Sequence, residues 1–306
     1  MRQAWLPLAV LGALAAAPFL GFGGSYETTL MARAMILGMA AISLAFLVGG
    51  AGLVSLGHAA SLGIGAYAVA ILDAHGITDA ARVLPTAVGA AAVFSLVTGA
   101  IAIRTAGVHF IMITLAFGQM AFFTASSLAA YGGDDGYTMY SRTEVMGTRL
   151  LESRLAFHYI CLAALALTWA LCAMLLASRF GRVLRASREN AQRVEAVGVA
   201  PYPYRLVGYT LAGALGGMAG FLLANATEFV SPATLSWQRS GELLFMVILG
   251  GAGRLWGAIL GALVFVLLET WLAQQMQHWK LVFGPLLVLS VIFLRGGLAG
   301  LVARRG

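Results

Sequence analysis

Long apolar segments alternate with short polar stretches along the whole chain. Ten such segments can be read in the 306 residues. They cover residues 5–21, 29–48, 55–72, 84–103, 108–129, 155–177, 205–226, 241–250, 255–272 and 281–294. A transmembrane helix needs about 20 predominantly apolar residues, so this pattern predicts membrane spans. The eighth segment is short for a span, and we expect either a half-helix or a helix that begins near Ser236.

The composition excludes a soluble globule. Hydrophobic residues make up 60% of the chain and charged residues only 10%, whereas soluble domains carry about 25% charged residues. A bilayer requires each span to satisfy its own backbone polar groups, which favours helices. We therefore expect an all-α, polytopic integral membrane protein with a single domain over residues 1–306 and about eight to ten spans. The first segment resembles a signal peptide, but we expect it to be retained as a span.

A basic stretch, residues 178–198, sets the expected orientation. Its charged residues are five arginines and two glutamates: Arg179, Arg182, Arg185, Arg188 and Arg193, with Glu189 and Glu195. Arg-rich short loops stay on the cytoplasmic side, so residues 178–204 are assigned to a cytoplasmic loop. With both termini cytoplasmic, 12 of the 19 Lys and Arg residues lie inside and six outside, where residues 130–154 form a periplasmic loop. An eight-span fold with re-entrant segments at 55–61 and 241–254 keeps this orientation.

Small residues recur four positions apart in three regions of the chain. These are Gly57, Ser61 and Gly65; Gly213 with Gly217 and Gly216 with Gly220; and Gly253, Gly257 and Gly261. On a membrane helix, such residues form a ridge that lets two backbones approach closely. We expect tight helix packing at these ridges, with sliding along the seams as the alternative.

Nothing in the sequence predicts catalysis, a metal or a cofactor. The single lysine, Lys280, is followed by Leu281, so the chain lacks the Gly-Lys-Ser/Thr of an ATP-binding P-loop. The five histidines are scattered without metal-ligand spacing. Cys161 and Cys172 fall on one expected helix about 16 Å apart, too far for a disulfide. The net charge of +7 comes without a basic patch interleaved with aromatics, so it does not indicate nucleic-acid binding.

Polar side chains in or beside apolar segments are the candidates for a transport pathway, because ionisable groups in a span are costly. The selected residues are Ser55, His58, Tyr67, Thr114 and Glu242. His58 either lines a cavity or bonds a backbone carbonyl at a helix break. Glu242 and Glu269 either face the pathway or lie near span ends. The loop at 131–136, YGGDDG, is either a solvated turn or part of a docking surface for an external protein.

The basic stretch also contains a candidate partner surface. Residues 182–197 are long enough for a short helix that Gly198 and Pro201 would end. Such a helix lying on the membrane surface would present a solvated basic side. It either contacts lipid headgroups or forms a coupling helix that docks into a cytoplasmic ATPase.

Several motifs, in their joint order and spacing, resemble those of the LivM-type permeases of branched-chain amino-acid ABC importers. They are GLVSLGHAA at 52–60, GIGAY at 63–67, TLAFG at 114–118, GGDDG at 132–136, FGRVLRA at 180–186, REN at 188–190, EAVG at 195–198, SGE at 240–242, LGGAG at 249–253 and WG at 256–257. The resemblance runs from about residue 33 to residue 298. Ser61 and His109 depart from the family, which often has an aromatic residue at each of these positions.

The resemblance implies a bacterial inner-membrane permease that is not itself an enzyme. It also implies three kinds of partner beside the lipid bilayer: a LivH-like second permease, two cytoplasmic ATP-binding subunits and a periplasmic substrate-binding protein. The residues that would engage the ATPase are Arg185, Arg188, Glu189, Asn190, Glu195, Ala196 and Gly198. The expected cargo is a branched-chain or other hydrophobic amino acid. The alternatives are a permease for urea or short amides and, from a different class, a stand-alone secondary transporter or channel.

Overall fold

The computed structural model describes residues 5–19, 24–145, 147–293 and 296–304. Its α-helices are α1 (Trp5–Ala16), α2 (Ser25–Phe46), α3 (His58–Ala74), α4 (Ala80–Ala102), α5 (Val108–Ser127), α6 (Arg154–Ala177), α7 (Arg179–Glu189), α8 (Ala191–Ala196), α9 (Pro201–Thr227), α10 (Trp237–Gly250), α11 (Leu255–Gln275), α12 (Trp279–Phe293) and α13 (Gly297–Arg304). Two short strands, β1 (Tyr137–Thr138) and β2 (Phe229–Val230), form an antiparallel pair. The expected all-α class is confirmed, and each of the ten apolar segments contains a helix within its described residues; residues 20, 21 and 294 of these segments lie outside the described part of the chain.

Within the described residues, six helices are long and apolar enough to cross a membrane. They are α2 with its continuation to Ala51, α4, α5, α6, α9 and α11. The segment Leu6–Phe19 and α3 are shorter apolar helices. These lengths agree with a polytopic membrane protein.

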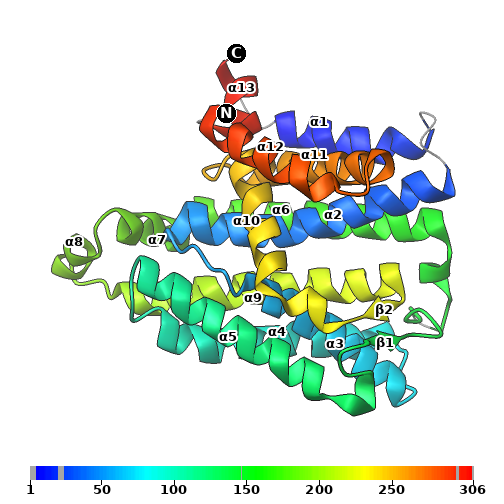
Figure 1. The fold of residues 1–306 in the computed structure, drawn as a ribbon. Coiled ribbons are helices and arrows are strands. Elements are labelled where there is room, and N and C mark those ends of the chain that lie inside the picture. Colours follow the sequence, from blue (N-terminus) through cyan, green and yellow to red (C-terminus); the bar gives the residue numbers. More distant parts are fainter. Residues whose placement is uncertain (1–4, 20–23, 146, 294–295, 305–306) are drawn as a thin grey trace.

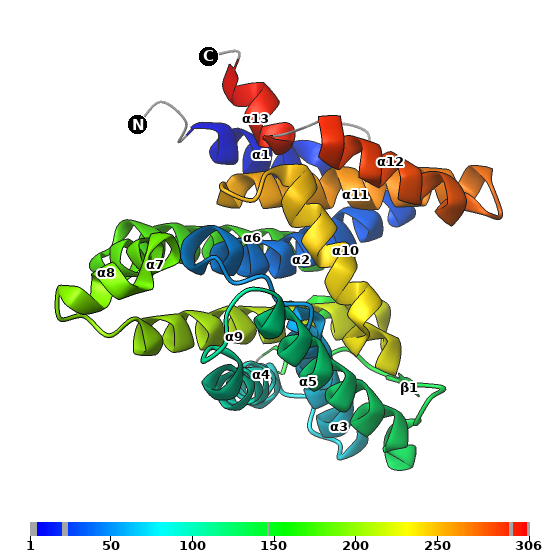
Figure 2. The ribbon, with the colours of Figure 1, turned by 60° about the vertical axis from the view of Figure 1, so that its left-hand side comes forward.

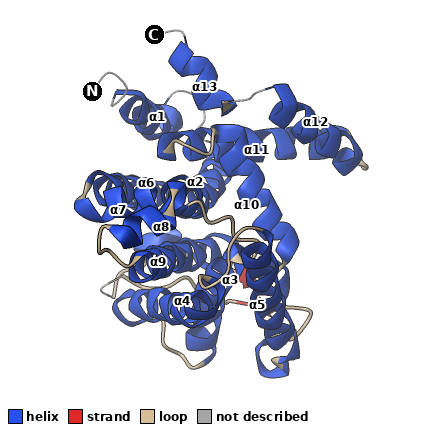
Figure 3. Ribbon diagram, turned by 90° about the vertical axis from the view of Figure 1, so that its left-hand side faces the viewer, coloured by secondary structure: helices blue, strands red, loops and turns tan. Residues whose placement is uncertain are grey.

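The helices form two groups that α2 joins. Figures 1 and 3 show α1, α2, α6, α11 and α12 on one side and α3, α4, α5 and α9 on the other. Helix α10 runs across the direction of its neighbours in Figure 1 and links the two groups. Helix α2 packs against α6, α9, α10 and α11, and its residues 34–47 are all buried. This helix is therefore the axis of the core.

Glycine ridges bring several helix backbones into direct contact. A Cβ atom at Gly65 would collide with the Gly217 backbone of α9, and one at Gly220 would collide with the Leu62 carbonyl of α3. A Cβ at Gly57 would collide with the carbonyl of Thr114 on α5. The predicted close packing is confirmed at these positions. The third ridge holds only in part: Gly257 and Gly261 contact α10, whereas a Cβ at Gly253 would meet nothing within 4 Å.

Four predicted boundaries differ from the structure or are sharpened by it. Helix α3 begins at His58 rather than at 55, and α9 begins at Pro201 rather than at 205, so α9 takes up the end of the loop expected at 178–204. The basic stretch forms two helices instead of one helix over 182–197, because Asn190 is extended and its side chain accepts a hydrogen bond from the Arg193 amide. The eighth segment does extend back, to Trp237, and the Ser236 hydroxyl caps it.

Replacing Gly220 with Ala is expected to lower the stability of the purified protein by about 1–3 kcal/mol, because the added methyl group must push α3 away from α9. Thermal unfolding in detergent measures this change. The matched control is Gly89→Ala on α4, where the new Cβ meets nothing within 4 Å. Equal melting temperatures for the two variants would contradict the proposed backbone contact.

Candidate coupling surface and translocation pathway

The two helices of the basic stretch project beyond the ends of the longer helices. Figures 1 and 2 show α7 and α8 together at the end opposite the β1–β2 pair. Arginine side chains fasten α7 to the rest of the chain. Arg185 Nη1 donates to the Leu176 carbonyl at 2.8 Å, and Arg205 donates to the hydroxyl and carbonyl oxygens of Ser187. The surface is therefore held at its base while its outer side stays exposed.

A cavity of about 420 Å³ lies between α7 and α8. Its lining residues are Arg182, Val183, Ala186, Glu189, Asn190, Arg193, Val194, Val197 and Val199. The valine Val197 is 82% exposed, which is unusual for a large apolar side chain on a solvated helix pair. A groove with apolar walls and an arginine rim suits an apolar side chain flanked by acidic residues on a partner protein.

The predicted coupling residues fall into three positions on this surface. Glu189 and Asn190 line the groove. Glu195, Ala196 and Gly198 lie at the exposed end of α8, where Gly198 adopts a left-handed conformation (φ 85°). Arg185 and Arg188 point the other way, toward the helices that enter the membrane.

The end of α2 against α7 departs from regular helix geometry. Residues Leu47–Ala51 form a π-helical turn, and Gly52 follows in the left-handed region (φ 71°). Arg188 Nη1 donates to the Gly49 carbonyl at 2.7 Å. The Leu184 side chain lies 3.1 Å from where a Cβ of Gly50 would be. Arg188 and Leu184 of α7 therefore contact this turn directly, and π-helical turns are frequent at functional sites.

A buried polar cluster lies just beyond this turn, where α2, α3 and α10 meet. His58 Nε2 lies 2.7 Å from the Ser43 hydroxyl oxygen on α2. Because Ser43 donates its own hydrogen to the Ala40 carbonyl, the imidazole Nε2 is the donor of this bond. The Ala59 amide donates to the Ser240 hydroxyl on α10 at 3.0 Å, and the Gly57 amide donates to Ser55. His58 thus bonds a serine hydroxyl instead of the expected backbone carbonyl.

The structure separates the predicted pathway residues into three places. Ser55 and His58 belong to the buried cluster, and Thr114 lies beside it on α5 with its hydroxyl bonded to the Ile111 carbonyl. Tyr67 instead lines an apolar cavity of about 470 Å³ between α3, α4 and α5. Its hydroxyl is buried without a hydrogen-bond partner among the described residues. Glu242 is paired with Arg239 on α10 at 2.5 Å.

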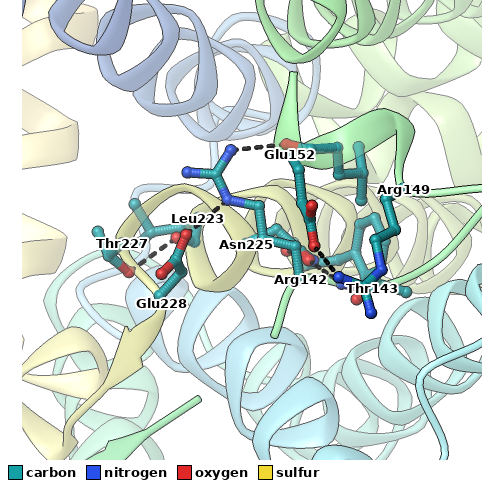
Figure 4. A network of polar contacts seen from close by, with 10 residues as sticks. Arg142, Thr143, Arg149, Glu152, Leu223, Asn225, Thr227 and Glu228 are labelled. Atoms are coloured by element: carbon teal, nitrogen blue, oxygen red, sulfur yellow. Dashed lines mark hydrogen bonds and ion pairs between the residues drawn. The ribbon is translucent and has the colours of Figure 1, made fainter. Parts of the chain in front are cut away.

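At the opposite end of the molecule, the loop at 130–154 is tied down by a polar network (Figure 4). Arg142 Nε donates to the Glu228 carboxylate at 2.7 Å, and its Nη1 donates to the Leu151 carbonyl at 2.6 Å. The Thr143 amide donates to the buried Asn225 side chain at 2.8 Å. The Arg142 guanidinium also lies over the Phe157 ring, 5.3 Å from its centroid. These contacts hold the loop against the end of α9 and the start of α6, beside the β1–β2 pair.

Sequence reasoning missed this network, since Arg142, Asn225 and Glu228 carry no local pattern that would single them out. A turn of three left-handed glycines, Gly132, Gly133 and Gly136, leads into β1. Asp134 and Asp135 on this turn are exposed. Burial and the nearby Asp73 carboxylate raise the pKa of Tyr137, which donates to Asp73 at 3.3 Å. The acidic turn is thus presented on an ordered loop.

Comparison with known proteins assigns the chain to a family. The sequence model of the family described as "Branched-chain amino acid transport system / permease component" matches residues 27–292. The chain belongs to this family. Among the described residues, no group of three or more His, Cys, Asp or Glu side chains is placed to hold a metal ion. As a member of this family, the chain is a multi-pass membrane permease of the ABC-transporter class, and its family works with ATPase and other transporter components.

Two similar relatives are the high-affinity branched-chain amino-acid permease proteins LivM of Salmonella typhimurium and Escherichia coli. They are 28% and 27% identical to this chain, in alignments that cover 97% of it and 75% of each relative. The autoinducer 2 import permease LsrC of Klebsiella pneumoniae is 32% identical over 45% of this chain and 44% of its own length. In a comparison with solved structures, none matches the chain. The resemblance seen in the sequence motifs is therefore confirmed.

Replacing Arg142 with Ala is expected to destabilise the protein by about 1–3 kcal/mol, because Glu228 and the Leu151 carbonyl lose a charged donor. The melting temperature in detergent reports the change. Arg149→Ala is the control from the same loop: its side chain is 70% exposed and its ion pairs to Glu144 and Glu152 are long. The control should change stability by about 0.5 kcal/mol or less. A control variant as unstable as Arg142→Ala would refute the role assigned to Arg142.

Proposed function

We propose that this chain is the LivM-like subunit of an importer for branched-chain or other hydrophobic amino acids. The observation that carries this proposal is the groove between α7 and α8. Helix α7, which forms one side of it, packs directly against the π-helical turn at the end of α2. The extended similarity to the LivM proteins supports the choice of cargo. The chain has no P-loop of its own, since its one lysine precedes a leucine, so the energy must come from partners.

The proposed complex contains a LivH-like second permease, two cytoplasmic ATP-binding subunits and a periplasmic substrate-binding protein. The permease LivH of Methanocaldococcus jannaschii is 32% identical over 39% of this chain, which supports pairing of two related permeases. In this arrangement residues 178–204 face the cytoplasm and the loop at 130–154 faces the periplasm. Its exposed acidic turn, with Asp134 and Asp135, is the proposed docking point for the binding protein.

The coupling mechanism follows from the contacts of α7. The ATPase inserts an apolar side chain into the groove and meets Glu195, Ala196 and Gly198 at the exposed end of α8. Its nucleotide-driven movement shifts α7, which holds the π-helical turn through Arg188 and Leu184. A partner can shift a conformational equilibrium only by binding two states with different affinity. The two states of this chain would differ in how the turn at 47–51 is bent.

In the proposed cycle, the pathway residues respond to the bending of this turn. Bending at 47–51 would strain the bond between His58 and Ser43, whose buried cluster closes the centre of the protein in the present conformation. The apolar cavity beside Tyr67 offers space of about 470 Å³ between α3, α4 and α5. An apolar amino-acid side chain suits its walls, and the unpartnered Tyr67 hydroxyl is available to a polar group of the cargo.

Arg188→Ala is expected to lower uptake by about tenfold or more while ATP hydrolysis by the reconstituted complex continues. A charged hydrogen bond is worth about 1.5–3 kcal/mol, and 1.4 kcal/mol corresponds to a factor of ten. Uptake and ATPase activity are measured together in proteoliposomes. The control Arg179→Ala removes the same charge from an exposed position on α7 and should keep both activities. Equal behaviour of the two variants would mean that α7 acts through charge alone.

The cargo is tested by competition in the same proteoliposomes. Leucine uptake should require ATP and all partner subunits, and unlabelled isoleucine or valine should compete while urea does not. Competition by urea would favour the permease for urea or short amides. Uptake by this chain alone, driven by an ion gradient, would replace the ABC mechanism with secondary transport.

A further inference from the structure

A third cavity lies far from the coupling surface, between α2 and α11. Its volume is about 330 Å³. The polar residues that line it are Tyr26, Thr29 and Arg33 on α2, with Glu269, Thr270 and Gln274 on α11. Figures 1 and 2 show the start of α2 and the end of α11 at the end of the molecule opposite α7 and α8. Nothing in the proposed transport cycle uses this cavity.

Two side chains of opposite charge, Arg33 and Glu269, line the cavity. Arg33 and Glu269 belong to helices apolar enough to span a membrane, where an ionised side chain is costly and marks a functional site. Their closest atoms, Arg33 Nη2 and Glu269 Oε2, are 3.4 Å apart. This distance is longer than the separation of about 2.8 Å between donor and acceptor atoms that is typical of a charge-assisted hydrogen bond. The two side chains are 38% and 17% exposed.

Both charged groups retain hydrogen-bonding capacity. A guanidinium has five N–H donors and a carboxylate accepts about four hydrogen bonds. Within the described part of the chain, the structure gives each of these groups one hydrogen bond, to the other. A ligand that carries an anionic oxygen and an N–H cation a few bonds apart would satisfy both while leaving the pair electrically balanced.

The cavity extends along α2 from Tyr26, near the start of the helix, to Arg33. Tyr26, 58% exposed, accepts a hydrogen bond from Gln274 Nε2 at 3.0 Å. Arg33 lies seven residues, or about 10 Å at 1.5 Å per residue, further along α2. Trp271, 59% exposed, stands on the last turns of α11. Exposed Tyr and Trp at span ends are typical of the level where lipid headgroups lie.

We propose that this cavity binds a zwitterion with a primary ammonium group, and that its source is the headgroup of an ethanolamine phospholipid. The phosphate contacts Arg33 and the ammonium contacts Glu269. A choline headgroup has no N–H to donate, and a glycerol headgroup brings a phosphate toward Glu269 without a compensating cation. A free amino acid carries the same pair of groups, so the test includes it as a second source.

The experiment compares melting temperatures of the purified full-length protein in nanodiscs of phosphatidylcholine, phosphatidylethanolamine and phosphatidylglycerol with identical acyl chains. Bound lipid stabilises the folded state by mass action, and at about one hundred times its dissociation constant the expected rise is about 5 °C for phosphatidylethanolamine. The other two lipids should lack this rise. A separate sample in phosphatidylcholine receives leucine.

Variants locate the effect. Arg33→Gln and Glu269→Gln should each abolish the difference between the ethanolamine and choline lipids. Arg149→Gln and Glu152→Gln, which alter an exposed ion pair in the loop at 130–154, should preserve it. Native mass spectrometry of the unmodified protein, which needs no variant to fold, should show preferential retention of the ethanolamine lipid.

Each outcome bears on the proposal. A leucine-induced rise in phosphatidylcholine that Arg33→Gln removes would keep the zwitterion site and assign it to a soluble amino acid. Equal melting temperatures in all lipids, without a leucine effect, would overturn the proposal. It would also be overturned if the two cavity variants and the two loop variants responded alike. None of these results depends on uptake, so the site can fail while the proposed transport function stands.

Discussion

The interrupted backbone between α2 and α3 is the constraint on which the rest of the structure depends. Inside a membrane no water satisfies a free amide or carbonyl, so irregular backbone persists only where protein groups replace water. Here Ser55 and Ser240 accept hydrogen bonds from backbone amides of the break. Arg188 supplies a donor to the carbonyl of Gly49 from the other side. The break therefore binds α10 and α7 to the same short segment.

Close helix packing makes this arrangement possible. Gly57 lets the start of α3 lie on the backbone of α5, and Gly65 and Gly220 let α3 lie on α9. In lipid the gain from association comes from such contacts and from hydrogen bonds between helices, because lipid tails are as apolar as leucine. A glycine of α9 also borders the polar cluster around His58, since a Cβ at Gly216 would lie 3.8 Å from His58 Nε2. A small rotation of one helix would change several of these contacts together.

The two ends of the molecule use charge in different ways. At the α7–α8 end, arginines bond to backbone carbonyls, which fastens the helices and leaves the groove open to a partner. At the other end, Arg142 is enclosed by a carboxylate, a carbonyl and an aromatic ring, which fixes a long loop (Figure 4). The first arrangement suits a part that moves with a partner. The second suits a surface that must keep its shape.

The sequence by itself determined the features that depend on neighbouring residues. The ten apolar runs each predicted a helix, the cluster of arginines located the projecting helices α7 and α8, and glycines four apart predicted the seams on α3 and α9. The tertiary structure alone decided the contacts between distant residues. Arg33 meets Glu269 across 236 positions, Arg142 meets Glu228 across 86, and His58 bonds Ser43 rather than a carbonyl. Hydropathy and spacing act within one helix, whereas the partner of a polar side chain depends on which helices pack together and at what rotation.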